Sequence, residues 1–236
     1  MHTQWYKYSI NFIAALVAIM AGLFIAESLI AAHTNEQDDV QSTVVAGQLA
    51  PRLQNLGNHK FPVTTNSARA QLFINQGLML AYGFNHAEAE RSFREAARLD
   101  PNCAMAYWGM ALVQGPNINM AMAPEAEQPA HEAIRQAEAL KKTVSEREQA
   151  YIDALAKRYS GEEKPNRSAL DRAYAAAMRE LHDRYPADLD AATLYAEAEM
   201  NLRPWNYWTR DMQPYPETAQ ILDVLESVMA RNPNHP

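Results

Sequence analysis

The chain has 236 residues, 48% of them hydrophobic, so it can bury a core of ordinary size as one domain or as an extended array. Its formal net charge of -7 and pI near 5.5 give no basic surface for nucleic acid, and we exclude that class of partner. The single cysteine, Cys103, excludes an internal disulfide framework and a multi-cysteine metal site. Glycine is scarce and long alternating strands are absent, which predicts an all-α protein.

Residues 1–32 form a separate segment built around an apolar run. Lys7 precedes the run, which extends over 12–26 and is interrupted at Glu27. Its length is that of a secretory signal, and residues 10–32 would also just cross a bilayer at about 1.5 Å per residue. We therefore predict a signal peptide or an N-terminal membrane anchor, and expect contact with a membrane only through this segment. Positive charge before the run and acidic residues after it predict export, to the periplasm or to the outer face of the inner membrane.

Residues 33–66 carry polar, proline and glycine interruptions without a sustained helical period. This composition predicts a linker. We expect the linker to become partly ordered near Leu53, Leu56 and Phe61, where apolar residues return.

Three helices with recognisable ends are predicted next. The first covers 67–82 and ends at Gly83, a plausible C-cap. Asn85 and Glu88 have the spacing of a capping arrangement that opens a second helix, which runs to Leu99. Pro101 separates it from a third helix over 103–113.

The second helix has a face made for close packing. Ala89, Phe93 and Ala96 follow one another at helical spacing, and the charged residues lie mostly off this stripe. Small residues on both sides of an aromatic ring allow a neighbouring helix to approach while the ring fills the gap. This arrangement predicts half of a helical hairpin.

Residues 70–101 resemble a tetratricopeptide repeat (TPR). The positions that carry the resemblance are Phe73, Gly77, Ala89, Phe93, Ala96 and Pro101. Gln76 departs from the pattern, which usually has leucine there, and its amide must find a buried partner. A second unit starts at Ala104 and is interrupted by an insertion, and the later units match weakly. The stretch over 82–119 is also similar to a group of exported bacterial repeat proteins, a likeness that implies no mechanism.

The resemblance implies stacked antiparallel helix hairpins, a TPR-like α-solenoid with irregular repeats over 67–236, and we predict about eight helices between 67 and 231. In such arrays the first helix of each pair lines a concave surface. That surface would include Ile74, Leu78, Trp108 and Leu112. It is unusually apolar, and so would be covered by an added helix, by the chain's own insertions or by an apolar partner peptide. The corresponding face of a later helix is polar at Asp190, Thr193 and Glu197, which predicts a groove that is apolar at one end and acidic at the other.

Two insertions are candidate binding loops, "GPNIN" over 115–119 and "RPWNYW" over 203–208. Loops held on a rigid scaffold often carry binding residues, and aromatic, arginine and amide groups can hold a peptide or a sugar. We select Asn117, Asn119, Arg203, Trp205 and Trp208 as partner-binding candidates. The alternative is that the tryptophans close the ends of the helical layers.

Motifs for catalysis or metal binding are weak. His86 and Glu88 are two residues apart and do not face each other on a helix, so they form no helical metal pair. Cys103 lies near a helix start but has no identifiable base, and the Met120–Met122 pair is a poor copper motif. No Gly-rich phosphate loop or nucleophile elbow occurs. We expect no metal and no cofactor.

The prediction for function is a non-catalytic extracytoplasmic scaffold that binds a peptide or partner protein through the concave surface and its loops. An alternative is an enzyme with a pocket where both insertions converge with His86, and a third possibility is a structural assembly subunit. Residues 232–236, "NPNHP", resemble the opening of another helix, so we also expect a chain truncated at its C-terminus.

Overall fold

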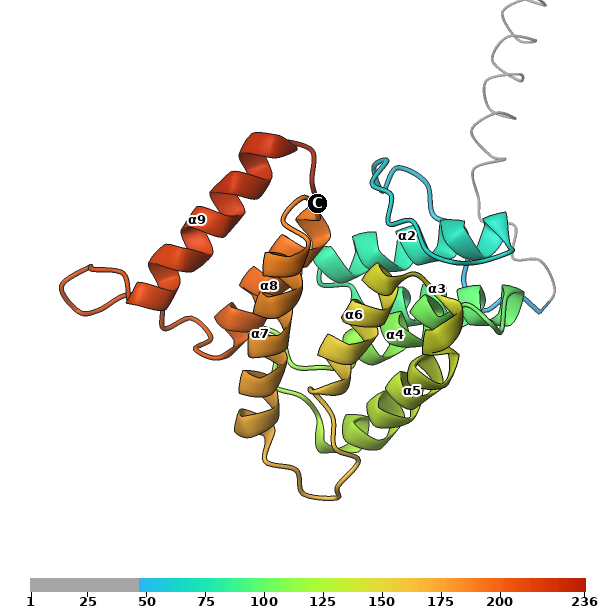
Figure 1. The fold of residues 1–236 in the computed structure, drawn as a ribbon, viewed down its shortest axis with the longest axis horizontal. Coiled ribbons are helices and arrows are strands. Elements are labelled where there is room, and N and C mark those ends of the chain that lie inside the picture. The colour runs from blue at the N-terminus through green and yellow to red at the C-terminus, as the bar shows by residue number, and fades with distance from the viewer. Residues whose placement is uncertain (1–46) are drawn as a thin grey trace, which may run out of the picture. The chain divides into compact units, whose positions relative to one another are not determined.

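The structure is a computed structural model, and it describes residues 47–236 (Figure 1). Eight α-helices, and no strands, occur within this range. They are α2 (Ala68–Tyr82), α3 (His86–Leu99), α4 (Ala104–Leu112), α5 (Glu127–Leu140), α6 (Glu146–Ala156), α7 (Arg167–Arg184), α8 (Leu189–Asn201) and α9 (Pro216–Arg231), with 3₁₀ turns at Pro124–Ala126 and Lys141–Thr143. The predicted all-α class is confirmed, as is the predicted number of helices.

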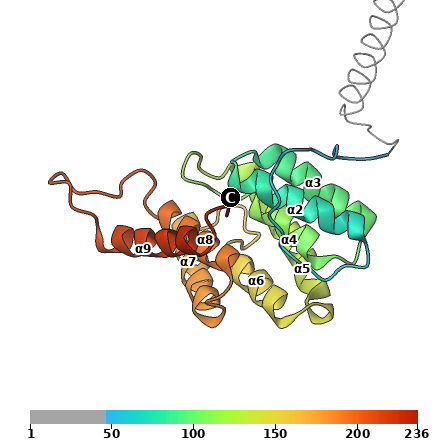
Figure 2. The same ribbon diagram turned by 90° about the horizontal axis from the view of Figure 1, so that it is seen from above.

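Each helix packs on the next one along the chain, from α2 on α3 to α8 on α9 (Figures 1 and 2). Helix α4 also contacts α2 and α6. This successive packing of neighbours is that of a helical repeat-like fold, in which each helix buries its apolar stripe against adjacent helices.

The ring of Phe93 fills the seam between α2, α3 and α4. It is fully buried. A Cβ atom built on Gly77 of α2 would lie 2.7 Å from the ring, and one on Gly109 of α4 would lie 2.3 Å from it. Only glycine therefore permits both helices to approach the ring. Ala89 and Ala96, on the same stripe of α3, are also completely buried, as the sequence pattern predicted.

Helix α2 begins and ends where its local residues indicate. The Ser67 hydroxyl accepts a hydrogen bond from the Ala70 amide, and Gly83 is the C-cap. The left-handed residue, however, is Phe84, with φ of 57°. A hydrogen bond of 2.8 Å from the Asn85 amide to the Leu80 carbonyl closes this turn. The resulting conformation is costly for a residue with a bulky side chain.

The predicted capping arrangement at Asn85 is wrong, because its side chain makes no capping hydrogen bond. Glu88 instead pairs with Arg91 at 3.0 Å. A complete capping box occurs at the start of α6, where Ser145 and Glu148 each bond the other's backbone amide.

Residues 47–66, which we call the covering segment, pack against the helices. Phe61 is fully buried, and its ring stacks on Trp108 with 5.8 Å between the centroids. The amide of Gln76 accepts from Leu53 and donates to Pro51, both at 2.8 Å. The departure of Gln76 from the repeat pattern thus has a physical reason, since its side chain holds the backbone of this segment.

The predicted leader over 1–32 and the first part of the predicted linker lie outside the described residues. Within 47–236, no helix is both long enough and apolar enough to cross a membrane.

Candidate ligand pocket between α2, α4 and α8

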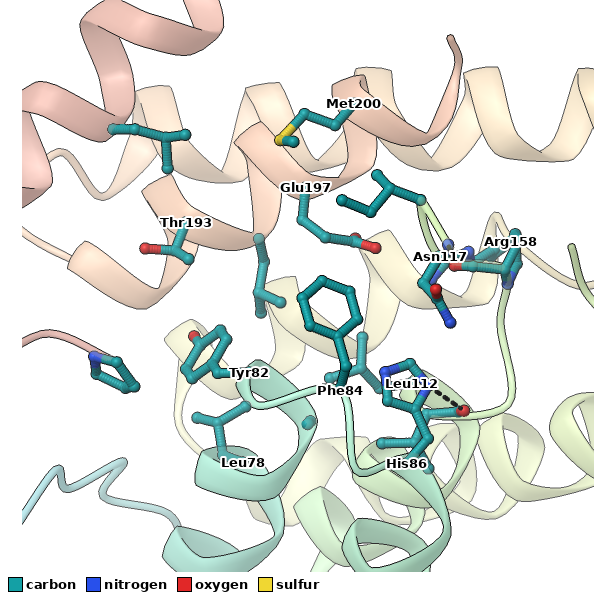
Figure 3. Close-up of a pocket in the computed structure, with 17 residues that line it drawn as sticks. Leu78, Tyr82, Phe84, His86, Leu112, Asn117, Arg158, Thr193, Glu197 and Met200 are labelled. Atoms are coloured by element: carbon teal, nitrogen blue, oxygen red, sulfur yellow. Dashed lines mark hydrogen bonds between the residues drawn. The ribbon is translucent and has the colours of Figure 1, made fainter. Parts of the chain in front are cut away.

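A cavity of about 200 Å³ lies where α2, α4 and α8 meet the loop after α4 (Figure 3). Helices α2 and α4 supply mainly apolar side chains, whereas α8 supplies both polar and apolar ones, Thr193 and Glu197 together with Leu194 and Met200. The side chains labelled in Figure 3 are Leu78, Tyr82, Phe84, His86, Leu112, Asn117, Arg158, Thr193, Glu197 and Met200. The cavity is therefore mainly apolar, with one carboxyl group, that of Glu197, in its wall.

The left-handed turn at Phe84 places an aromatic ring in the pocket wall. This ring is 49% exposed and stacks on His86, with 6.2 Å between centroids and 7° between planes. Figure 3 shows it between the carboxylate of Glu197 and the His86 imidazole. Strained backbone conformations are concentrated at functional sites, and this one orients a side chain toward a cavity.

Glu197 extends from the middle of α8 into the cavity. Its Oε1 accepts a hydrogen bond from the Asn201 amide, while its Oε2 is buried and has no hydrogen-bond partner among the described residues. Burial raises the pKa of Glu197, and the nearby Arg158 offsets this only in part. A buried carboxylate oxygen without a protein partner is unusual, and it is free to accept a hydrogen bond from a bound molecule.

Arg158, which follows α6, lines the cavity and is almost fully buried. Its Nη2 donates to the Pro116 carbonyl at 2.7 Å, and its guanidinium lies over the Tyr174 ring, 4.5 Å from the centroid. A Cβ atom on Gly115 would lie 2.6 Å from this guanidinium. The glycine of the "GPNIN" insertion therefore leaves the space that the arginine occupies.

His86, the first residue of α3, is held as a neutral imidazole. Its Nδ1 lies 3.1 Å from the Val113 carbonyl, which can only accept, so Nδ1 carries the proton and Nε2 keeps a lone pair. Burial lowers the pKa of His86. At neutral pH the pocket thus contains an unprotonated imidazole nitrogen as well as the Glu197 carboxyl.

The predicted concave-surface residues divide into two groups. Leu78 and Leu112 line the pocket, while Ile74 and Trp108 are buried away from it. The Trp108 indole donates to the Tyr151 carbonyl at 3.2 Å, and its ring stacks on Phe61. The part of the apolar face around Trp108 is covered by residues of the predicted linker, the covering segment, which was not among the expected occupants.

The two insertions also have different positions. Asn117 lines the pocket, and its Oδ1 accepts from the exposed Asn119 amide at 2.9 Å. None of Arg203, Trp205 and Trp208 lines it. They lie in the loop between α8 and α9. The pocket therefore contains His86 and the "GPNIN" insertion, as predicted for the enzyme alternative, but residues of α8 line it where "RPWNYW" was expected.

Trp205 and Trp208 are 71% and 47% exposed, so they do not close the ends of the helical layers. Arg203 lies over the ring of Tyr215, 4.0 Å from its centroid.

Neither Arg158 nor Glu197 is among the site residues predicted from the sequence. Glu197 shares a predicted polar helix face with Asp190 and Thr193, and this helical spacing is the sequence signal that could have identified it. Arg158 had none, because it follows a helix end in a charged stretch and nothing local indicates its burial.

Comparisons with known proteins give no relative from which to transfer a function. No family model matches the chain, and no significant match occurs among curated proteins or solved structures. The TPR resemblance therefore stays a prediction.

Proposed function

We propose that the protein binds a small organic ligand in the pocket between α2, α4 and α8. The ligand has an apolar body and a hydrogen-bond donor, best an amine, that meets Glu197. The observation that carries this proposal is the unpartnered Oε2 of Glu197 in the wall of a mainly apolar cavity.

The size of the cavity limits the ligand to a compact molecule. An apolar cavity of about 150 Å³ accepts benzene, so one of about 200 Å³ suits a single ring with a short substituent. Leu78 and Leu112 would contact the apolar body. A protonated amine at Oε2 would form a charge-assisted hydrogen bond in a setting with little water, where such bonds are strong.

The pocket is also suited to proton transfer on a bound ligand. Burial raises the pKa of Glu197 and lowers that of His86, so the two values shift in opposite directions and both groups favour their uncharged forms. Pairs of titratable groups with perturbed pKa values are frequent in active sites. The enzyme alternative is therefore supported by the presence of these two groups in one pocket, on either side of the Phe84 ring.

Thermal unfolding in the presence of matched ligands tests the proposal. Benzylamine is expected to raise the midpoint temperature more than toluene does, because only the amine can donate to Glu197. Glu197→Gln should abolish the difference between the two compounds, whereas Glu199→Gln, on the same helix and paired with Arg179 at 3.2 Å, should preserve it. Equal shifts for both compounds in the unmutated chain, or none, would reject the amine preference.

A second candidate function is the predicted binding of a peptide or partner protein, favoured by the exposure of Trp205 and Trp208 in one loop. Large aromatic residues are enriched where proteins bind each other. Replacing both tryptophans with alanine should then remove a specific partner from a pull-down of envelope extract. Met229→Ala, at another exposed apolar position on α9, serves as the control.

A further inference from the structure

A cluster of three metal-ligating side chains lies outside the pocket. His59 comes from the covering segment, Asp190 from the first turn of α8 and His235 from the chain after α9. One ligand atom of each lies within 4.8 Å of the other two, and no other group of three such residues is found in 47–236. Three segments that are distant in sequence thus bring two imidazoles and one carboxylate together.

The distances in the cluster are close to those of a metal site. The Nε2 atoms of His59 and His235 lie 2.9 and 3.4 Å from Oδ1 of Asp190. Ligand atoms at about 2.0–2.2 Å from a tetrahedral metal ion are about 3.3–3.6 Å apart. Small movements of these side chains would therefore complete the site.

The orientation of His235 leaves one nitrogen available as a ligand. Its Nδ1 lies 3.2 Å from the oxygen of Pro236, and donation there leaves a lone pair on Nε2. This Nε2 is buried and has no hydrogen-bond partner among the described residues, although it faces Asp190. Two acceptors that face each other need a cation or a proton between them.

The surroundings of Asp190 also resemble the outer shell of a metal centre. The Tyr82 hydroxyl donates to Oδ1 of Asp190 at 2.8 Å, which fixes the carboxylate. Arg147 borders the same cleft, but it pairs with Asp188 at 2.5 Å, so its charge is compensated. The environment therefore does not present an uncompensated arginine to an incoming cation.

We propose that His59, Asp190 and His235 bind a divalent transition-metal ion, with Zn²⁺ the best fit to two imidazole nitrogens and one carboxylate oxygen. Three protein ligands leave a fourth position for water or a substrate. The residues border a cleft of about 580 Å³, which also includes Asn58, Lys60 and Asn234. The ion would connect the covering segment to α8 and to the chain after α9. This site does not depend on the ligand proposed for the pocket, although Tyr82 and Pro236, which contact Asp190 and His235, also line that pocket.

Zinc titration of the full chain, purified without a polyhistidine tag and stripped with a chelator, tests the site. Calorimetry is expected to give one Zn²⁺ bound per chain. Co²⁺ in its place should give the visible absorption of a tetrahedral centre. His235→Ala and Asp190→Asn should each weaken Zn²⁺ binding by about 100-fold or more.

His131→Ala, which removes a histidine outside the cluster, is the matched control and should bind as the unmutated chain does. Circular dichroism of each variant checks that the helices are intact, and His235→Gln repeats the test with a side chain closer in size. The proposal is overturned if the unmutated chain binds no stoichiometric Zn²⁺, which would mean that Asp190 pairs only with imidazolium protons. It is equally overturned if both folded His235 variants keep full affinity.

Discussion

Helices α2 to α4 and helices α7 to α9 differ in how their buried polar groups are satisfied. In the first region, Gln76 bonds Pro51, Leu53 and Ser92, and the buried Glu95 bonds Arg98 and the Leu49 amide. In the described part of the chain, the buried side-chain polar atoms that lack a hydrogen bond all lie from residue 158 onward. They belong to Arg158, Tyr174, His182, Tyr195, Glu197, Asn201 and His235.

This difference separates a structural region from one suited to binding. The covering segment supplies the partners that the first region needs, so its interior is complete without any added molecule. In the later region, burial has removed polar groups from water without giving each of them a protein partner, which is costly unless something else binds there. Both proposed sites use atoms of this second kind.

The largest expected effect is on the seam of the first region. Phe93→Ala should lower the free energy of unfolding by about 3–5 kcal/mol, because it empties a site enclosed by Gly77 and Gly109. Urea unfolding followed by circular dichroism measures this change. Phe84→Ala, which removes a half-exposed ring, should cost much less, and equal losses would contradict the assignment of the seam.

The next effect concerns the bonds to the covering segment. Gln76→Leu introduces the residue that is usual at this position of the repeat which the sequence resembles. It should nevertheless destabilise this protein by about 1–3 kcal/mol, because Leu53 and Pro51 lose their partners. Urea unfolding again gives the value. A neutral or stabilising result would show that these hydrogen bonds contribute little.

Two tyrosines provide a direct test of the contrast between satisfied and unsatisfied groups. The Tyr159 hydroxyl donates to the Ala111 carbonyl at 2.6 Å, whereas the buried Tyr174 hydroxyl has no hydrogen-bond partner within 47–236. Tyr159→Phe should cost about 1 kcal/mol, and Tyr174→Phe should change stability by less than about 0.5 kcal/mol or increase it. Chemical unfolding of the two variants side by side measures both. The reverse order would mean that Tyr174 has a partner in solution.

The smallest effect is a pH dependence due to His86. Because its pKa is lowered in the folded chain, the unfolded chain binds a proton first as the pH falls below 6.5. Stability attributable to His86 is therefore complete above pH 6.5 and is lost as the pH falls through the folded pKa. The measurement compares the unfolding free energies of the unmutated chain and of His86→Gln at pH 7.5 and 5.5. His235, whose pKa is raised, has a pH dependence of the opposite sign. Because His235 is present in both chains, the difference between their pH dependences gives the contribution of His86. Parallel pH profiles would exclude the neutral buried state of His86.

Local signals made the helices of the first region predictable. Ser67, Gly83 and Pro101 lie at helix ends, and the spacing of Ala89 and Phe93 gives the packed face, so the observed bounds differ from the predicted ones by only a residue or so. A local signal of the same kind, the capping box of Ser145 and Glu148, opens α6.

The sites were less predictable, because they depend on which segments meet in three dimensions. Glu197 was placed on a polar face, but its lack of a partner follows from the packing of α8 against the rest of the pocket. His59 and His235 have no periodic relation to each other or to Asp190. Only the path of the covering segment and of the chain after α9 brings them together.

The covering segment also determines which recombinant fragments of this protein will remain soluble. A fragment cut at Ser67, where the predicted helical domain begins, would leave the indole of Trp108 without the Phe61 ring that stacks on it. Such a fragment would expose an apolar surface to water and is expected to self-associate during expression. Ala50 is itself almost fully buried, so a well-behaved fragment has to start ahead of it.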